Sequence, residues 1–150
     1  MHKRVFLTST DTTVGFISKS QNALDKAKQR AKGKKYITAL PNLKSLKKRV
    51  PKKHKNRVRR SKKTTYIVKG YSFRIVKNKT HNLLLNRLGW AYTTSANKSN
   101  EEFNINYATT QADIIAYPLQ DSKPSKILKL GKGKIIKIRS SNQARWWRRI

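Results

Sequence analysis

The chain has 150 residues, enough for one domain with a hydrophobic core, and its 37 lysines and arginines outnumber six acidic residues to give a formal net charge of +31. Such a charge favours polyanionic partners, although a lysine-rich composition bias alone produces the same charge. The absence of cysteine excludes disulfides, thiolate zinc sites and a cysteine nucleophile. No apolar stretch reaches the length of a membrane span or a signal-peptide core, so we expect a cytoplasmic protein with no membrane partner.

The N-terminal third alternates between strand and helix patterns. Gly15 is expected in the loop after the first strand, and Ser20 is a plausible N-cap for the helix that follows. The apolar spacing predicts strands at residues 4–8 and 35–40 and helices at residues 20–30 and 41–50.

A strongly basic block, PKKHKNRVRRSKK, occupies residues 51–63. It contains almost nothing apolar, so we expect a loop or arm that is solvated unless it holds an anion.

The rest of the chain reads mainly as strands. Gly70 separates two strand patterns and predicts a hairpin, and a helix ending at Gly89 follows. The expected strands are residues 64–70, 71–77, 90–97, 112–119, 125–130 and 134–139, with the helix at residues 80–89. This order predicts one α/β domain over residues 1–139 with a mixed, twisted sheet. A basic tail at residues 140–150 follows. Its Trp146 and Trp147 either stack on unpaired bases or cover the sheet.

Four polar clusters fall at predicted strand or helix ends, where binding residues gather in open α/β sheets. Each also has a local explanation: hydroxyls form turns after strands, and cations at a helix C-terminus complement the helix dipole. The clusters are TSTDTT at residues 8–13, KQRAKGK at 28–34, TTSANKSN at 93–100 and the segment 123–139.

No catalytic triad, paired carboxylates or metal-ligand spacing is present. The three histidines, His2, His54 and His81, lie in unrelated contexts, and GKGK lacks the spacing and the Ser/Thr of a phosphate-binding P-loop. We therefore expect no metal ligands from the protein itself.

Taken in order, these clusters resemble the YrdC-like family of threonylcarbamoyl-AMP synthases over roughly residues 5–139. The resemblance implies a twisted α/β fold with a mixed, largely antiparallel sheet and a central basic cavity. It implies the conversion of L-threonine, bicarbonate and Mg²⁺-bound ATP into threonylcarbamoyl-AMP and pyrophosphate. That product serves tRNA threonylcarbamoyladenosine modification, with a tRNA-threonylcarbamoyl transferase complex as a partner.

The resemblance also implies site residues, none of which is a protein nucleophile or a general base. Asp11 would fix the loop that carries Thr10. The ATP-binding set is Lys28, Arg30, Lys34, Ser95, Asn97 and Arg139, and the threonine-binding set is Thr10, Arg74 and Ser125.

Several loop residues depart from the family pattern. Val14 stands where the family has tyrosine, Ala31 where it has proline, and Asn100 where it has glycine. The alternative hypothesis is therefore a non-catalytic module on the same fold that binds tRNA or double-stranded RNA. Its candidate RNA-binding residues are Lys52, Lys53, Lys55, Arg57, Arg59 and Arg60.

Overall fold

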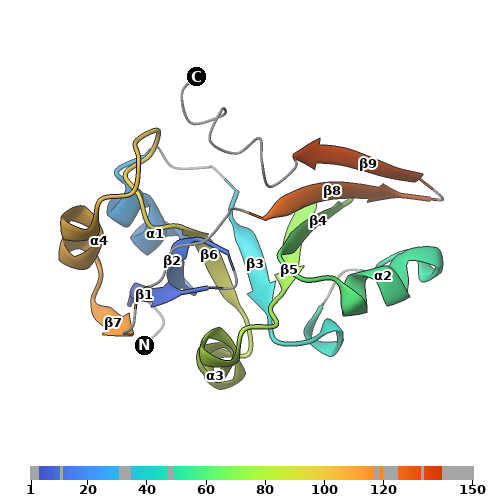
Figure 1. Ribbon diagram of the computed structural model, residues 1–150, viewed down its shortest axis with the longest axis horizontal. Helices are drawn as coiled ribbons and strands as arrows, with labels where there is room; N and C mark the ends of the chain where they lie inside the picture. The colour runs from blue at the N-terminus through green and yellow to red at the C-terminus, as the bar shows by residue number, and fades with distance from the viewer. Residues whose placement is uncertain are drawn as a thin grey trace.

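The computed structural model describes residues 4–10, 12–30, 35–46, 49–116, 119, 125–132 and 134–139. Figure 1 shows α1 and α4 at the end of the sheet that carries β1, β2 and β7, and α2 at the other end beside β4 and β5. The strands are β1 (Phe6–Ser9), β2 (Val14–Ser18), β3 (Ile37–Leu40), β4 (Thr64–Val68), β5 (Tyr71–Ile75), β6 (Ala91–Ser95), β7 (Ile114–Ala116), β8 (Lys126–Gly131) and β9 (Lys134–Arg139). The α-helices are α1 (Gln21–Lys28), α2 (Lys55–Arg60), α3 (Lys79–Leu88) and α4 (Ile105–Gln111), and short 3₁₀ turns are η1 (Leu43–Ser45) and η2 (Lys52–His54).

The described strands form one nine-stranded sheet in the order β7-β1-β2-β6-β3-β5-β4-β8-β9. β1 with β7, β3 with β5 and β4 with β8 are parallel, and the other neighbours are antiparallel. The predicted mixed α/β architecture and the β4–β5 hairpin are therefore confirmed. The strands expected at residues 125–130 and 134–139 form as β8 and β9, and the structure shows that they pair with each other.

Strand β2 was not expected, because the sequence analysis placed Gly15 in a loop. The strand is buried along its whole length, and Gly15 pairs with Thr8 on one side and Ser95 on the other. A Cβ on Gly15 would lie 3.1 Å from both Thr10 Cγ2 and the Thr94 carbonyl oxygen. The glycine thus permits close packing in the middle of a sheet, and does not mark a turn.

The predicted helix at residues 41–50 is wrong. In the described residues 41–46 and 49–50, only the 3₁₀ turn η1 forms, because the Asn42 side chain accepts a 3.1 Å hydrogen bond from the Ser45 backbone N–H and closes a local turn instead of a helix. Pro51 also disfavours helical geometry at Val50. The leucines that suggested one helix face, Leu43 and Leu46, still pack against the core formed around β4 and β5.

The basic block at residues 51–63 is also not the solvated loop or arm that its composition predicts. Residues 52–60 form η2 and α2, and two side chains fix them to the body of the protein. Val58 is fully buried, and His54 Nε2 lies 3.0 Å from the Gly131 carbonyl oxygen of β8. One buried valine and one histidine thus hold a mostly charged segment against the body of the protein. The average composition of the segment gives no sign of either contact.

Helix α4 was missed because its apolar periodicity is weak. Its N-terminus is capped by Asn104, whose side chain accepts hydrogen bonds from the backbone N–H groups of Asn106 and Tyr107. The strand expected at residues 112–119 is described only as β7, and Asp113 ties it to β1 by accepting a 2.8 Å hydrogen bond from the Val5 N–H. Among the described helices, none is long and apolar enough to cross a membrane.

Three hydrophobic clusters surround the sheet and position the helices. One joins α1 and α4 to β1 and β2, a second lies around β4, β5 and β8, and a third packs α3 against β1, β2, β3 and β6. The division into residues 1–139 and a tail stays a prediction, because residues 140–150 lie outside the described part.

We predict that Val58→Ala lowers the free energy of unfolding by about 2 kcal/mol, because it removes a buried side chain that anchors α2. Urea denaturation at moderate salt measures this. The exposed neighbour Arg59, changed to alanine, is the control and should alter stability by less than about 0.5 kcal/mol. Equal, small effects of both substitutions would show that α2 is not packed against the body.

Candidate functional site

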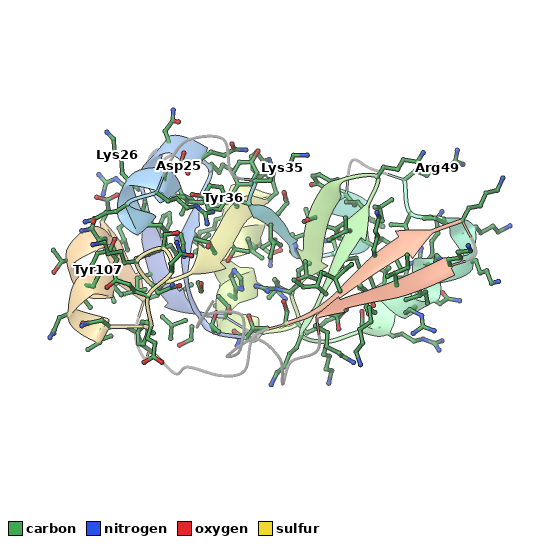
Figure 2. All side chains as sticks on the ribbon, turned by 90° about the horizontal axis from the view of Figure 1, so that it is seen from above. Asp25, Lys26, Lys35, Tyr36, Arg49 and Tyr107 are labelled. Carbon is green, nitrogen blue, oxygen red and sulfur yellow. The ribbon has the colours of Figure 1, made fainter. Side chains whose placement is uncertain are left out.

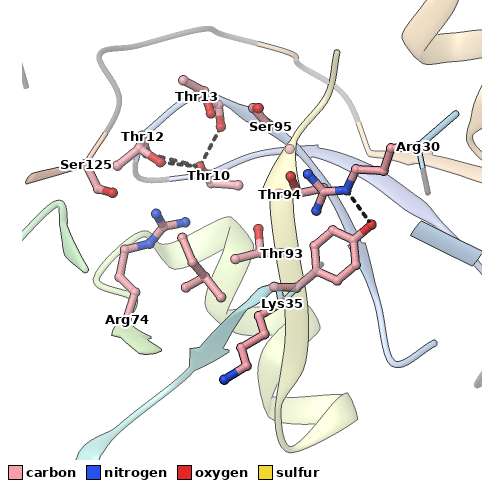
Figure 3. Close-up of a pocket in the computed structure, with 13 residues that line it drawn as sticks. Thr10, Thr12, Thr13, Arg30, Lys35, Arg74, Thr93, Thr94, Ser95 and Ser125 are labelled. Carbon is pink, nitrogen blue, oxygen red and sulfur yellow. Dashed lines mark hydrogen bonds between the residues drawn. The ribbon is translucent and has the colours of Figure 1, made fainter. Parts of the chain in front are cut away.

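A cavity of about 210 Å³ lies where β2, β3, β5 and β6 meet (Figure 3). Its wall carries three cations and a ring of hydroxyl groups, and none of the lining residues that the structure describes is acidic. The lining residues are Thr10, Thr12, Thr13, Gly15, Arg30, Lys35, Tyr36, Ile37, Arg74, Thr93, Thr94, Ser95 and Ser125.

The hydroxyl of Thr10 organises the loop between β1 and β2. It donates a 2.6 Å hydrogen bond to the Thr13 carbonyl oxygen and accepts one of 3.0 Å from the Thr12 N–H. This is the local turn that the sequence left open as an alternative for the threonine cluster. The turn also holds the Thr12 and Thr13 side chains on the cavity wall, while Asp11 lies outside the described residues.

Arg74 enters the cavity from β5. The residue is only 5% exposed, and its neighbour in the sheet is Ala39 of β3. His81 of α3 is fully buried, and neither of its ring nitrogens has a hydrogen-bond partner among the described residues. Burial, and secondarily the positive charge of Arg74, lowers the pKa of His81 to about 3, so this histidine is neutral and does not compete with Arg74 for an anion.

On the opposite side of the cavity, Arg30 is held by Tyr36 and Asp25. The Arg30 Nε–H donates a 3.1 Å hydrogen bond to the Tyr36 hydroxyl, which donates one of 2.5 Å to Asp25 Oδ1. The Arg30 guanidinium also lies 4.3 Å from the centre of the Tyr36 ring. Burial, and then the hydrogen bond to Asp25, raises the pKa of Tyr36 to about 12.

Lys28 lies behind this wall and does not line the cavity. It is 3% exposed, and its ammonium group donates hydrogen bonds to the Ser95 carbonyl oxygen at 3.0 Å and to Asn97 Oδ1 at 3.2 Å. Ser95 Oγ donates to the same Asn97 oxygen at 2.5 Å, and the Asn97 amide donates to the Lys98 and Glu101 carbonyls. This buried network fixes the end of β6 at the cavity rim.

Ser125 reaches the cavity from the start of β8. It is 2% exposed, and its Oγ lies 2.8 Å from Thr65 Oγ1 of β4. A segment far along the chain is thereby joined to the site.

The structure thus brings together five residues of the predicted ATP and threonine sets. Thr10, Arg30, Arg74, Ser95 and Ser125 line the cavity, whereas Lys28 and Asn97 support it from behind. Lys34 lies outside the described residues, and Arg139 ends β9 with a side chain that is not described. The predicted RNA-binding residues lie on η2 and α2, and none of them lines the cavity. The ligand roles of all these residues stay predictions.

Sequence reasoning missed several lining residues. Thr12, Thr13, Thr93 and Thr94 belong to the hydroxyl clusters that were noticed, and the clusters as a whole were the available signal. Lys35 and Tyr36 lie just before β3 and carried no such signal.

The described residues contain no group of three His, Cys, Asp or Glu side chains that could hold a metal ion.

No protein-family model matches the chain. A curated relative, the uncharacterized protein MG259 of Mycoplasma genitalium, is 39% identical over 98 residues. That match covers 64% of this chain but only 21% of the relative, so it spans about a fifth of that longer protein.

The fold has counterparts among solved structures. P. abyssi Sua5 complexed with L-threonine has a TM-score of 0.77 at 15% identity, covering 91% of this chain and 50% of that one. E. coli YciO has a TM-score of 0.71 at 19% identity over 91% and 82% of the two chains. Full-length HypF in a phosphate- and nucleotide-bound form has a TM-score of 0.73 at 16% identity, covering 91% of this chain and 27% of that one.

The chain therefore has the YrdC-like fold that the resemblance implied, which it shares with the Sua5/YrdC-family proteins Sua5 and YciO. It spans about half the length of the Sua5 structure. Identities this low show the fold alone, so activity has to be argued from the cavity.

We predict that Tyr36→Phe removes a tyrosine that ionises near pH 12, about two units above its ordinary value of 10.0. Ultraviolet difference titration of the two proteins isolates that one phenol. The raised pKa follows from burial and from the short hydrogen bond to Asp25. A difference spectrum with a midpoint near 10.0 would show that Tyr36 is neither buried nor hydrogen-bonded to Asp25 in solution.

We predict that His81 contributes to acid destabilisation. Its pKa is lowered from 6.5 to about 3 in the folded state. Between pH 6.5 and pH 3, His81 is therefore protonated in the unfolded chain but not in the folded chain. Stability should therefore fall from pH 6.5 towards pH 3, and less steeply in His81→Leu. Histidine ring resonances, assigned with that variant, should show no titration of His81 near pH 6.5; a midpoint there would contradict its burial.

Proposed function

We propose that the cavity binds L-threonine as its carbamate, with ATP at the rim beside Arg30, and forms threonylcarbamoyl-AMP. The observation that carries the proposal is the placement of Arg74 at one side of a hydroxyl-lined cavity and Arg30 at the other, with Thr93 between them (Figure 3). The chain would then supply this intermediate for tRNA threonylcarbamoyladenosine modification, with a transferase complex as the partner that consumes it.

The charge of the cavity favours the carbamate over the free amino acid. Free threonine is a zwitterion, and its ammonium group would meet three cations, Arg30, Lys35 and Arg74, with no acid among the described lining residues. Once the ammonium group has lost a proton, the amine attacks the carbon of bicarbonate: a C–N bond forms, a C–O bond breaks and water leaves. The ligand becomes a dianion with a carboxylate and a carbamate. A guanidinium such as that of Arg74 can bind the carboxylate through two parallel hydrogen bonds, which leaves the carbamate free to face the nucleotide.

The size of the cavity agrees with a site that encloses the amino acid and leaves the nucleotide at the rim. A volume of about 210 Å³ is smaller than the roughly 300–1,000 Å³ of typical pockets that enclose drug-sized ligands. The amino-acid part would be enclosed, and the nucleotide would extend along the rim formed by Ser95 and Arg30.

The reaction needs placement and charge neutralisation more than a protein nucleophile. A carbamate oxygen attacks the α-phosphorus of ATP, a new C–O–P linkage forms, the bond between the α-phosphorus and its bridging oxygen to the β-phosphate breaks, and pyrophosphate leaves. Arg30 and Lys35 would offset the negative charge of the phosphates, and the Lys28–Asn97 network would hold the rim rigid. Mg²⁺ would arrive bound to the triphosphate oxygens and shield their charge.

Two structural neighbours support the choice of ligands. One is a Sua5 structure complexed with L-threonine, and the other is HypF in a phosphate- and nucleotide-bound form. Both are longer than this chain, so their ligands support the proposal without establishing it here.

Calorimetric titration at moderate salt tests the proposal. L-Threonine should bind in the presence of bicarbonate and Mg²⁺–ATP, and Arg74→Met should weaken it by about 10- to 100-fold, because a charge-assisted hydrogen bond contributes roughly 1.5–3 kcal/mol. ATP affinity should respond mainly to Arg30→Met. The exposed Arg87 of α3, changed to glutamine, is the matched control and should leave both affinities unchanged.

A different result would contradict the proposal. ATP binding could instead depend on salt alone and weaken as the salt concentration rises. If it is also unaffected by threonine, bicarbonate and both cavity substitutions, the cavity is not a substrate site.

A further inference from the structure

The acidic residues are confined to part of the chain. No aspartate or glutamate occurs between residues 26 and 100. The described acids, Asp25, Glu101, Glu102 and Asp113, lie on or next to α1, α4 and β7. The end of the molecule that carries α2, β8 and β9 therefore has no described acid to balance its cations.

A groove of about 820 Å³ opens at this end, between α2 and the segment around η1. Its apolar lining comes from Leu43, Leu46, Val50 and Ile75, of which Val50 and Ile75 are almost fully buried. Figure 2 shows Arg49, one of its lining residues, at the opposite end of the molecule from Asp25 and Tyr107.

Five cations line the groove, and no acid does: Lys44, Arg49, Lys55, Arg59 and Lys77. They make up five of its eleven lining residues, against 37 lysines and arginines in 150 residues of the whole chain. None of the five side chains forms a hydrogen bond or ion pair with a residue in the described ranges; the one ion pair found there joins Lys98 to Glu101. Cations held this close repel one another, and a bound polyanion would relieve that repulsion.

The groove is separate from the cavity described above. The two share no lining residue, and adjacent residues of β5 divide between them: Arg74 lines the cavity and Ile75 lines the groove. Successive side chains of a strand point to opposite faces, so ligands at the two sites approach from opposite sides of the sheet.

The cations continue beyond the groove, which favours a polymer over a small anion. Lys52, Lys53, Arg57 and Arg60 are all exposed on η2 and α2, next to the groove wall formed by Lys55 and Arg59. A mononucleotide would fill the groove and leave those four unused, whereas a strand of linked phosphates can contact both sets.

We propose that this groove binds the phosphodiester backbone of a nucleic-acid strand, with RNA as its occupant. The sugar and base edges would rest on the aliphatic floor, and the phosphates would lie between the cations of the two walls. Lys44, Arg49 and Lys77 belong to the site together with Lys55 and Arg59. The proposal does not depend on synthase activity, because it concerns the other face of the sheet.

Fluorescence anisotropy of a labelled single-stranded RNA of mixed sequence tests this. The groove variant carries Lys44→Gln, Arg49→Gln and Lys77→Gln, three exposed positions whose substitution leaves the core intact. Its affinity should fall at least about tenfold at moderate salt, and the slope of log K against log salt should become shallower by about 2, at roughly 0.7 per lost phosphate contact.

A charge-matched control separates a site from diffuse attraction. Lys26→Gln, Arg87→Gln and Lys129→Gln also remove two lysines and one arginine, all exposed and all outside the groove. This control should change affinity by less than about threefold and keep the salt slope. Equal losses in the two triple variants, or unchanged binding by the groove variant, would overturn the proposal.

Competition identifies the occupant. Unlabelled RNA should displace the probe, DNA of the same sequence should do so less well, and ATP at equal phosphate concentration should not. Three outcomes would overturn the proposal. Displacement by ATP would make the groove a small-phosphate site, and equal displacement by DNA would remove the assignment to RNA. Equal displacement by anionic phosphatidylserine vesicles would make the groove a membrane-binding face.

Lysine acetylation with mass spectrometry should show RNA-dependent protection of Lys44, Lys55 and Lys77, a readout that does not depend on any variant folding.

Discussion

The buried ammonium group of Lys28 is the contact on which the site depends most. A lysine at 3% exposure is tolerated only when its charge is satisfied, and here the Ser95 carbonyl and Asn97 Oδ1 both accept hydrogen bonds from it. Because Lys28 ends α1 and Ser95 ends β6, the same interaction joins a helix to the rim of the cavity. Ser99 N–H also donates to the Lys28 carbonyl oxygen, so the backbone after β6 is tied at the same point. Loss of this contact would free the loop that carries Asn97 from the end of α1.

The excess positive charge is divided between two faces of the sheet. On one face, Arg30, Lys35 and Arg74 surround a small cavity whose remaining surface is mostly hydroxyl groups, a composition suited to a compact anion. On the other, unpaired lysines and arginines line an open groove and continue along α2, a composition suited to a long anion. The net charge of +31 is therefore not spread evenly, and the position of the few acids determines where it is left unbalanced. Under the two proposals, RNA would be held on a surface that leaves the substrate cavity open.

The sequence predicted secondary structure best where the apolar periodicity was clear and a glycine or a capping residue marked the end of the element. The β4–β5 hairpin, α1 and α3 have clear periodicity with a glycine or a cap at their ends, and all were predicted. The helix expected at residues 41–50 failed because the Asn42 side chain closes a local turn, and the arm expected at residues 51–63 failed because one buried valine, Val58, docks α2. Two cavity residues could be found by resemblance: Arg30, which belongs to one of the ordered clusters, and Arg74, which lies outside them. Tyr36 could not, because its role comes from contacts with Asp25 and Arg30 that form only when the segment before β3 packs beside the end of α1.

The central claim is that the cavity joins a threonine carbamate to AMP. Mass spectrometry of the purified protein incubated with L-threonine, bicarbonate and Mg²⁺–ATP measures this directly, with pyrophosphate followed in the same sample. The account predicts threonylcarbamoyl-AMP and pyrophosphate in equal amounts, dependent on all three substrates and abolished by Arg74→Met. Folded protein that binds ATP and threonine yet forms neither product would contradict it.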